Sequence, residues 1–327
     1  MMDISCAFAP VTDTPDHIRL AEELGFRRAW AFDTPAVQLD TYATLAVAAV
    51  KTSRIELGPG VIIPSLRHPM ATASAIATLA GLAPGRVNIA LGTGFSGRLA
   101  MGQKPNKWDF VAEYAQQVQG LLAGEIVEVE GRMIKMLHGP GQAPERPIRI
   151  PMLFGTAGPK GEALARQHAD GIFTVIPISS GFEWQSLLVQ GTVLDPGEDP
   201  DSPRVIEAAG GGASVVFHRA YDRPAPGRPK MEELKGGREW VETIESFDPS
   251  VRHLHTHEGH LTFVNEIDRK VITGDLIMKY TFTGEADALR PRIEELEEMG
   301  VTEIAFQPAG PDVPRELRAF AGMAGIA

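Results

Sequence analysis

Two stretches of this chain, RIELGPGVIIPSLRHP at residues 54–69 and GRVNIALGTGFSG at residues 85–97, decide its fold. Each begins with a short apolar run and ends in glycines, and an alanine-rich segment at 70–83 lies between them. Apolar strands that alternate with helices are typical of parallel sheets covered on both faces, in which right-handed crossovers join the strands. The pattern therefore predicts strands at 54–62 and 86–91 with a helix between them.

The same alternation extends outward in both directions, so that the whole chain predicts eight strands. We expect a turn of an outlying hairpin at Glu130-Gly131, a helical piece at 184–190 and a long late insertion at about 222–277. The remaining strands are expected at residues 3–9, 28–32, 147–154, 171–176, 205–218 and 302–307. Eight such units predict an α/β fold, a single (β/α)8 TIM-barrel domain over residues 1–327. A doubly wound sheet is disfavoured because the first strand is not followed by G-x-G-x-x-G.

Composition limits the partners of this protein. The 327 residues carry a net charge of −11, and 43% of them are hydrophobic. An acidic surface repels nucleic acid and anionic lipid, and no apolar run approaches the roughly 20 residues that span a bilayer. The single cysteine allows no disulfide within the chain. We therefore expect a cytoplasmic protein that acts on a small molecule and binds neither nucleic acid nor membrane.

Glycine-rich strand ends are the first candidates for a binding site, because barrel enzymes work at the carboxyl ends of their strands. Beside the bulky Val61, Gly60 suggests a bulge that lets backbone approach a flat ligand, although a simple bend of the barrel also explains it. Thr93 and Gly94 follow the next strand and could let a ring lie over its end, while tight loop packing explains Thr93 equally well.

A phosphate site is expected one strand further on. Thr156, Ala157 and Gly158 precede a helix whose proline fits the first helical position, so that free amides face outward. Lys160 adds a positive charge. The alternative is that this loop only starts a helix.

Taken together, these motifs resemble the luciferase-like superfamily. GPGVIIPSLRHP (58–69), GRVNIALGTGFSG (85–97) and PMLFGTAGPKGEALARQHADG (151–171) look like its methylenetetrahydromethanopterin reductase branch, whose enzymes depend on coenzyme F420. The likeness resumes at 281–308. It implies a (β/α)8 barrel, a non-prolyl cis bond at Gly60-Val61 beneath the ring, and use of the loop at 156–160 for the cofactor's phosphate.

The resemblance also shows departures from one group of relatives. Deazaflavin-dependent sugar-phosphate dehydrogenases carry an aspartate-histidine pair after the second strand, and here Asp33 matches the aspartate while Thr34 replaces the histidine. They also carry a glutamate near the position of Phe95. We therefore expect no action on sugar phosphates.

Histidines supply the candidate proton donors. His68 is expected either to cap the following helix or to line the pocket. Within RHLHTHEGHL, residues 252–261, His260 is a second candidate donor and Asp33 completes the predicted catalytic set. His257 is expected in the substrate pocket, with Thr34, Phe95 and Ser96. Alternating histidines on an extended stretch could chelate zinc, but the H-E-x-x-H spacing is absent, and we expect no metal.

Three functions follow from these expectations. The first is hydride transfer between F420 and a small organic substrate, with the protein holding the ring and placing a proton donor. The second is an FMN-dependent monooxygenase that uses oxygen, since FMN presents a similar ring and phosphate to the same loops. The third is a flavin-binding protein without catalysis. The resemblance further implies a possible homodimer, and Trp184 is expected beside an apolar pocket.

Overall fold

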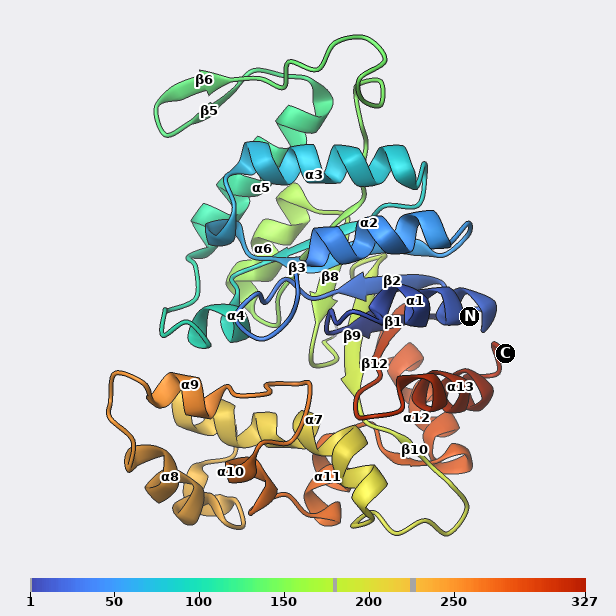
Figure 1. Ribbon diagram of the computed structural model, residues 1–327, viewed down its shortest axis with the longest axis vertical. Coiled ribbons are helices and arrows are strands. Elements are labelled where there is room, and N and C mark those ends of the chain that lie inside the picture. Colours follow the sequence, from blue (N-terminus) through green and yellow to red (C-terminus); the bar gives the residue numbers. More distant parts are fainter. Residues whose placement is uncertain (1, 179–180, 224–227) are drawn as a thin grey trace.

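Eight parallel strands form a closed barrel at the centre of the molecule (Figure 1). The computed structural model describes residues 2–178, 181–223 and 228–327. In order round the barrel, the strands are β1 (Asp3–Phe8), β2 (Arg28–Ala31), β3 (Glu56–Ile62), β4 (Ile89–Gly92), β7 (Met152–Gly155), β8 (Gly171–Thr174), β9 (Gln185–Gln190) and β12 (Glu303–Gln307). β12 pairs with β1 and closes the ring, so the predicted (β/α)8 barrel is confirmed.

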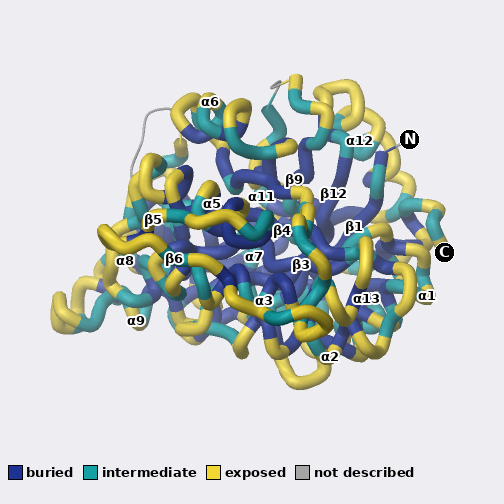
Figure 2. The backbone as a smooth tube through the Cα atoms, turned by 90° about the horizontal axis from the view of Figure 1, so that it is seen from above, coloured by how far each residue is buried: buried dark blue, intermediate teal, exposed yellow. Residues whose placement is uncertain are grey.

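Helices surround the barrel and bury its outer face. They are α1 (Thr14–Glu23), α2 (Thr41–Lys51), α3 (Pro69–Leu82), α5 (Trp108–Ala123), α6 (Pro159–His168), α12 (Ala286–Glu298) and α13 (Val313–Ala324). Figure 2 shows buried strands inside this ring, while the outer turns of the helices are exposed. Each helix contributes small or branched apolar side chains such as Ile18, Leu45 and Ile76, all fully buried, to the layer between helices and strands.

The expected outlying hairpin is present. β5 (Val127–Val129) pairs antiparallel with β6 (Arg132–Ile134), and Glu130 and Gly131 form the turn with φ of 51° and 73°. Two consecutive residues with positive φ are typical of a tight two-residue hairpin turn. Among the described residues, no helix combines the length and the apolar character needed to cross a membrane.

A helical layer, formed by the part of the chain that follows β9 and precedes β12, lies over one end of the barrel (Figure 1). It contains α7 (Pro203–Asp222), the 3-10 turn η2 (Met231–Glu233), α8 (Gly237–Glu245), α9 (Arg252–Thr256), α10 (Glu266–Arg269) and α11 (Gly274–Tyr280). At its base, β10 (Val193–Leu194) pairs parallel with β11 (Gly284–Glu285). Phe217, Trp240, Ile244 and Ile277 belong to its own buried apolar cluster, separate from the barrel core.

Two predictions for this late part are wrong. Residues 205–218, expected as the seventh strand, lie in α7, and residues 184–190, expected as a helix, contain the real seventh strand, β9. A short apolar run such as LLV within β9 fits a strand and a buried helix equally well, because periodicity does not separate them.

Close packing explains the misread glycines in α7. Glycine costs about 1 kcal/mol relative to alanine inside a helix, so the run Gly210-Gly211-Gly212 argues locally against one. However, a Cβ at Gly210 would lie 2.7 Å from Val264 Cγ2, and one at Gly212 would lie 2.9 Å from Gln190 Cβ. The glycines let α7 approach the end of β9 and the loop before α10, and this packing outweighs the weak propensity.

The opposite end of the barrel is closed by a buried carboxylate. Glu303, at the start of β12 and fully buried, accepts hydrogen bonds from Trp30 Nε1 at 3.0 Å, Trp184 Nε1 at 2.6 Å and Arg28 at 3.0 Å. The prediction that Trp184 lines the pocket is therefore wrong, because its indole is engaged at the amino ends of the strands.

Candidate active site

The carboxyl ends of β3, β4 and β7 meet on one rim. Gly92 pairs with Gly155, and the β3–β4 register shifts between Gly60 and Ile62. A Cβ at Gly92 would lie 2.8 Å from Val61 Cγ2, and one at Gly155 would lie 2.7 Å from Val61 Cγ1. The valine side chain thus lies against both glycines. The predicted bulge and the cis Gly60-Val61 bond are confirmed.

The loop after β4 turns directly into a short helix, α4 (Phe95–Leu99). Gly94 adopts a left-handed conformation with φ of 74°, and a Cβ there would lie 2.6 Å from Ile63 Cγ2. Both constraints favour glycine. Thr93 is half-buried, and its carbonyl accepts a hydrogen bond from Asn106 N at 2.8 Å. This compact turn places α4 at the mouth of the barrel.

The expected phosphate loop begins α6. Thr156 is buried and its Oγ1 accepts from the backbone N–H of Gly158 at 3.3 Å, while Ala157 is exposed. Gly158 is the N-cap without a side-chain cap, and a Cβ there would meet nothing within 4 Å. Lys160 is exposed, with Nζ 3.1 Å from the Asp109 carboxylate. Open space, an uncapped helix start and a nearby cation fit an anionic group.

Asp33 forms an ion pair with Arg67. Both carboxylate oxygens accept from one guanidinium nitrogen, at 2.7 and 2.8 Å, and Arg67 also reaches Asp40 at 2.7 Å. Burial raises the pKa of Asp33, and the hydrogen bonds from Arg67 oppose that rise. Arg67 lies over the ring of Tyr42 at 4.7 Å. Asp33 therefore orders the loop after β3, a role that its sequence position alone did not indicate.

His68 caps α3. Its Nδ1 accepts from Met70 N at 3.1 Å, and the residue is exposed. Of the two roles expected for His68, the structure shows the capping contact.

Three of the expected pocket residues gather at α4. Phe95 and Ser96 begin the helix, and Thr34 lies next to it, because a Cβ at Gly97 would be 3.4 Å from Thr34 Cγ2. Arg223, which follows α7, lies 5.4 Å from the Phe95 ring. The end of α7 therefore reaches the mouth of the barrel.

The histidine-rich segment is mostly helical rather than extended. His253 and His255 lie on α9, where His255 stacks on Phe247 at 3.6 Å. His257 and His260 turn inward and are buried. The expectation of alternating histidines on one extended face is wrong, because α9 rotates successive side chains to different directions.

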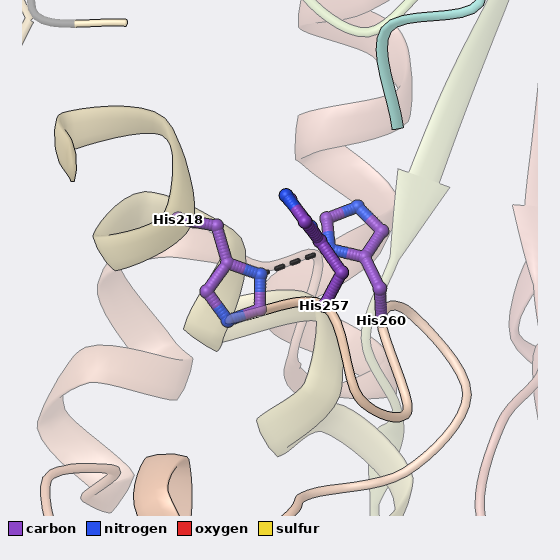
Figure 3. A group of neighbouring side chains, drawn as sticks. All are labelled: His218, His257 and His260. Carbon is purple, nitrogen blue, oxygen red and sulfur yellow. Dashed lines mark hydrogen bonds between the residues drawn. The ribbon is translucent and has the colours of Figure 1, made fainter. Parts of the chain in front are cut away.

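Three buried histidines of the helical layer, His218, His257 and His260, lie close together, as Figure 3 shows. His218 Nδ1 lies 2.9 Å from His260 Nδ1, which lies 3.5 Å from His257 Nδ1. One nitrogen of each lies within 4.8 Å of the others, so these three residues could hold a metal ion. Their outer nitrogens meet oxygens: His218 Nε2 is 3.1 Å from Asp268, His257 Nε2 is 3.1 Å from Asp222, and His260 Nε2 is 2.9 Å from Ser96 Oγ.

Burial controls the charge of this cluster. Burial lowers the pKa of His260 well below its ordinary value, and the neighbouring His218 and His257 lower it further. His260 is therefore neutral near pH 7. No motif singled out His218 or Asp268, which lie 42 and 8 residues from His260 along the chain and meet only through the packing of α7 and α10.

Comparison with known proteins agrees with this arrangement. Residues 5–207 match the family model described as luciferase-like monooxygenase. This chain belongs to the luciferase-like family. The expected family is therefore confirmed.

Particular luciferase-like relatives are similar over different lengths. A 5,10-methylenetetrahydromethanopterin reductase of Methanolobus tindarius is 28% identical over 94% of each chain. An F420-dependent hydroxymycolic acid dehydrogenase of Mycobacterium tuberculosis is 31% identical over 47% of this chain and 46% of its own. A solved F420-dependent secondary alcohol dehydrogenase, in complex with an F420-acetone adduct, has a TM-score of 0.68 at 18% identity and covers 99% of this chain and 98% of its own.

Proposed function

We propose that this protein is an oxidoreductase that transfers hydride between coenzyme F420 and a small organic substrate. The observation that carries the proposal is the shared rim of β3, β4 and β7, where Val61 lies against Gly92 and Gly155. The F420 dependence of the mycobacterial dehydrogenase and of the secondary alcohol dehydrogenase supports it. Bound F420 supplies or accepts the hydride.

Three regions of this chain would hold the cofactor. The bulge at Gly60 and Val61 would support a planar ring from one side, and the compact turn at Thr93 and Gly94 would lie beside it. The loop of Thr156, Ala157 and Gly158, with Lys160, would bind the phosphate through α6 amides and charge. These assignments use the uncapped helix start and the open space at Gly158.

The helical layer would exclude water from the reacting atoms. A Cβ at Gly102, just beyond α4, would lie 3.0 Å from the His253 ring, so α9 packs on the loop after α4. The buried Gln307, at the end of β12, donates to the carbonyl of Leu261 at 2.5 Å and accepts from Gln190 at 3.2 Å. The histidine segment is thus held over the strand ends, where exclusion of water strengthens polar interactions with the substrate.

The substrate side would be formed by α4 and the neighbouring loop. Thr34, Phe95 and Ser96 offer one ring and two hydroxyls at the barrel mouth, and His260 contacts Ser96 from below. We assign proton handling to His260 and Ser96. Asp33 and His68, which the sequence suggested as catalytic, instead order the Arg67 loop and cap α3.

Equilibrium binding of the purified protein to F420 and, separately, to FMN tests the proposed function. F420 is expected to bind, and its absorbance should change with an oxidisable or reducible partner. Gly155→Ala pushes a methyl group against Val61 and should weaken F420 binding roughly tenfold. Gly322→Ala, where a Cβ meets nothing within 4 Å, is the matched control.

Two results of this titration would count against the proposal. Submicromolar binding of FMN without binding of F420 would favour the oxygen-using monooxygenase. Binding of either cofactor without turnover of any tested partner would favour the non-catalytic flavin-binding protein.

We also propose that two copies pair through α2. Val47 and Val50 lie three residues apart on one face of this helix and are 45% and 67% exposed, so that a partner copy would cover both. Light scattering should give the mass of a dimer, and Val50→Glu should reduce it to that of a monomer. A monomeric wild-type protein would refute the pairing. The cytoplasmic location and the lack of affinity for nucleic acid stay predictions from composition.

A further inference from the structure

Two of the buried histidines, His218 and His260, belong to a hydrogen-bonded chain that starts at Asp268; Figure 3 shows the link between the two rings. The carboxylate of Asp268 accepts hydrogen bonds from Trp240 Nε1 at 2.8 Å and from Asn265 Nδ2 at 3.2 Å, and it lies 3.1 Å from His218 Nε2. Burial raises its pKa, but the hydrogen bonds from His218 and Trp240 outweigh burial and hold the pKa below the ordinary value. An ionised carboxylate only accepts, so His218 carries its proton on Nε2.

With His218 taken as neutral, which is part of the proposal below, that assignment gives the direction of each later hydrogen bond. A neutral His218 with a proton on Nε2 offers a lone pair on Nδ1, 2.9 Å from His260 Nδ1. His260 must therefore carry its proton on Nδ1 and donate it to His218. Its Nε2 is then an acceptor, and Ser96 Oγ, 2.9 Å away, must donate to it.

Ser96 is consequently a directed group at the barrel mouth. The hydroxyl proton of Ser96 is directed at His260 Nε2. The Ser96 oxygen can therefore only accept a further hydrogen bond. Such an oxygen accepts from a substrate O–H or N–H and has no free donor for a substrate that lacks one.

A bound metal ion explains the cluster less well. A tetrahedral zinc ion with Zn–N bonds of about 2.0–2.1 Å places its ligand nitrogens roughly 3.3 Å apart. The 2.9 Å separation of the two Nδ1 atoms of His218 and His260 is that of an N–H···N hydrogen bond. Each of the three histidines also has an oxygen close to its Nε2: Asp268 for His218, Asp222 for His257 and Ser96 for His260.

We propose that Ser96, His260, His218 and Asp268 form a proton relay, and that the substrate is an alcohol or amine with its carbonyl or imine product. The proposal rests on the proposed function, since F420 takes the hydride. As hydride leaves the substrate carbon, the O–H or N–H bond on the adjacent atom breaks and its proton passes to Ser96 Oγ. The serine proton passes to His260 Nε2, and the His260 Nδ1 proton passes to His218 Nδ1.

The relay ends in a stabilised ion pair. His218 becomes an imidazolium that holds the Asp268 carboxylate, so the proton taken from the substrate is compensated by a buried negative charge. In the reverse direction the same protons move back and the carbonyl or imine is protonated as hydride arrives. His257, Asp222 and Arg219 are the other ionisable groups that face His260.

Nitrogen-15 NMR of histidine-labelled protein tests the chain without any substrate. At neutral pH, His218 is expected as the Nε2–H tautomer and His260 as the Nδ1–H tautomer. Ser96→Ala should change the nitrogen-15 chemical shift of His260 Nε2 and leave the shifts of His218 unchanged. Identical tautomers for the two residues, or one equivalent of zinc in the purified protein by elemental analysis, would overturn the relay.

Turnover with F420 tests the substrate class. The probes are propan-2-ol, cyclohexanol and isopropylamine with oxidised F420, and cyclohex-2-enone, whose activated alkene needs no O–H or N–H, with reduced F420. Oxidation of an alcohol or amine is expected. Ser96→Ala should lower kcat at least about 100-fold with F420 affinity unchanged, and Ser96→Thr, which keeps a hydroxyl, should restore much of it.

His218→Gln separates proton transfer from mere support. It should lower kcat and change the pH profile of kcat, because glutamine cannot take the relayed proton, whereas His255→Gln on α9 should do neither. Turnover of the enone alone, or an unchanged Ser96→Ala variant, would refute the relay. Absence of F420 binding by the wild-type protein, or F420 binding without turnover of any probe, would refute the proposed function instead.

Discussion

The glycine run in α7 allows one substitution to have opposite effects at adjacent positions. At Gly211 a Cβ would lie 3.4 Å from the nearest atom, Phe263 O, which is ordinary contact. At Gly212 it would lie 2.9 Å from Gln190 Cβ, which is an atom close to the backbone of β9 and has little freedom to move. Alanine gains about 0.8–1 kcal/mol over glycine within a helix. Overpacking costs about 1–3 kcal/mol.

Gly211→Ala should therefore stabilise the protein by up to about 1 kcal/mol. Gly212→Ala should destabilise it, by up to about 2 kcal/mol after the helical gain is subtracted. Urea unfolding followed by circular dichroism measures both, with the two variants compared at equal slope. Equal stabilisation by both variants would mean that α7 does not pack closely on β9, and the explanation of its glycines would fail.

Three further predictions concern charge. Lys160→Ala should weaken F420 binding about three- to tenfold in a titration, since it removes the cation beside α6; the equally ion-paired Lys51→Ala, away from the site, should leave the affinity unchanged. Because the folded pKa of His260 is depressed, the free energy of unfolding should fall as pH drops below about 6.5, by up to roughly 1.4 kcal/mol per pH unit, and His260→Gln should flatten that slope in urea titrations at several pH values. Glu303→Gln removes one negative partner of Arg28 and should lower the free energy of unfolding by about 3 kcal/mol in the same urea assay. An unchanged urea midpoint would contradict the role of Glu303 in closing the barrel.

Most of the barrel could be predicted from the sequence, because its early strands are apolar runs that end in turn-forming residues. The rim at Gly60, Gly92 and Gly155 could be predicted for the same reason, since the ends of adjacent parallel strands meet at one edge. The cis bond at Gly60-Val61 came from family resemblance, as local propensity argues against any non-prolyl cis bond.

The late part could not be predicted from local pattern. The glycines of α7 and the polar and apolar residues of β9 adopt their conformations because the two elements pack together, as at Gly212 and Gln190. Long-range contacts also decide the site: Arg67 engages Asp33, and α7 brings His218 to His260. The sequence pointed to Ser96 and His260 at one end of the relay. His218 and Asp268, at the other end, were missed because their spacing along the chain does not indicate that they meet in the fold.

The short pairing of β10 with β11 has a consequence for how this protein could change. The chain enters the helical layer just after Leu194 and leaves it at Gly284, and Val193 pairs directly with Gly284. Everything between, including α7 and both carboxylates behind the histidines, therefore departs and returns through neighbouring points. Such a segment is exchangeable in the way of an inserted module: a different one could be joined at the same two points, giving new chemistry above an unaltered cofactor cradle.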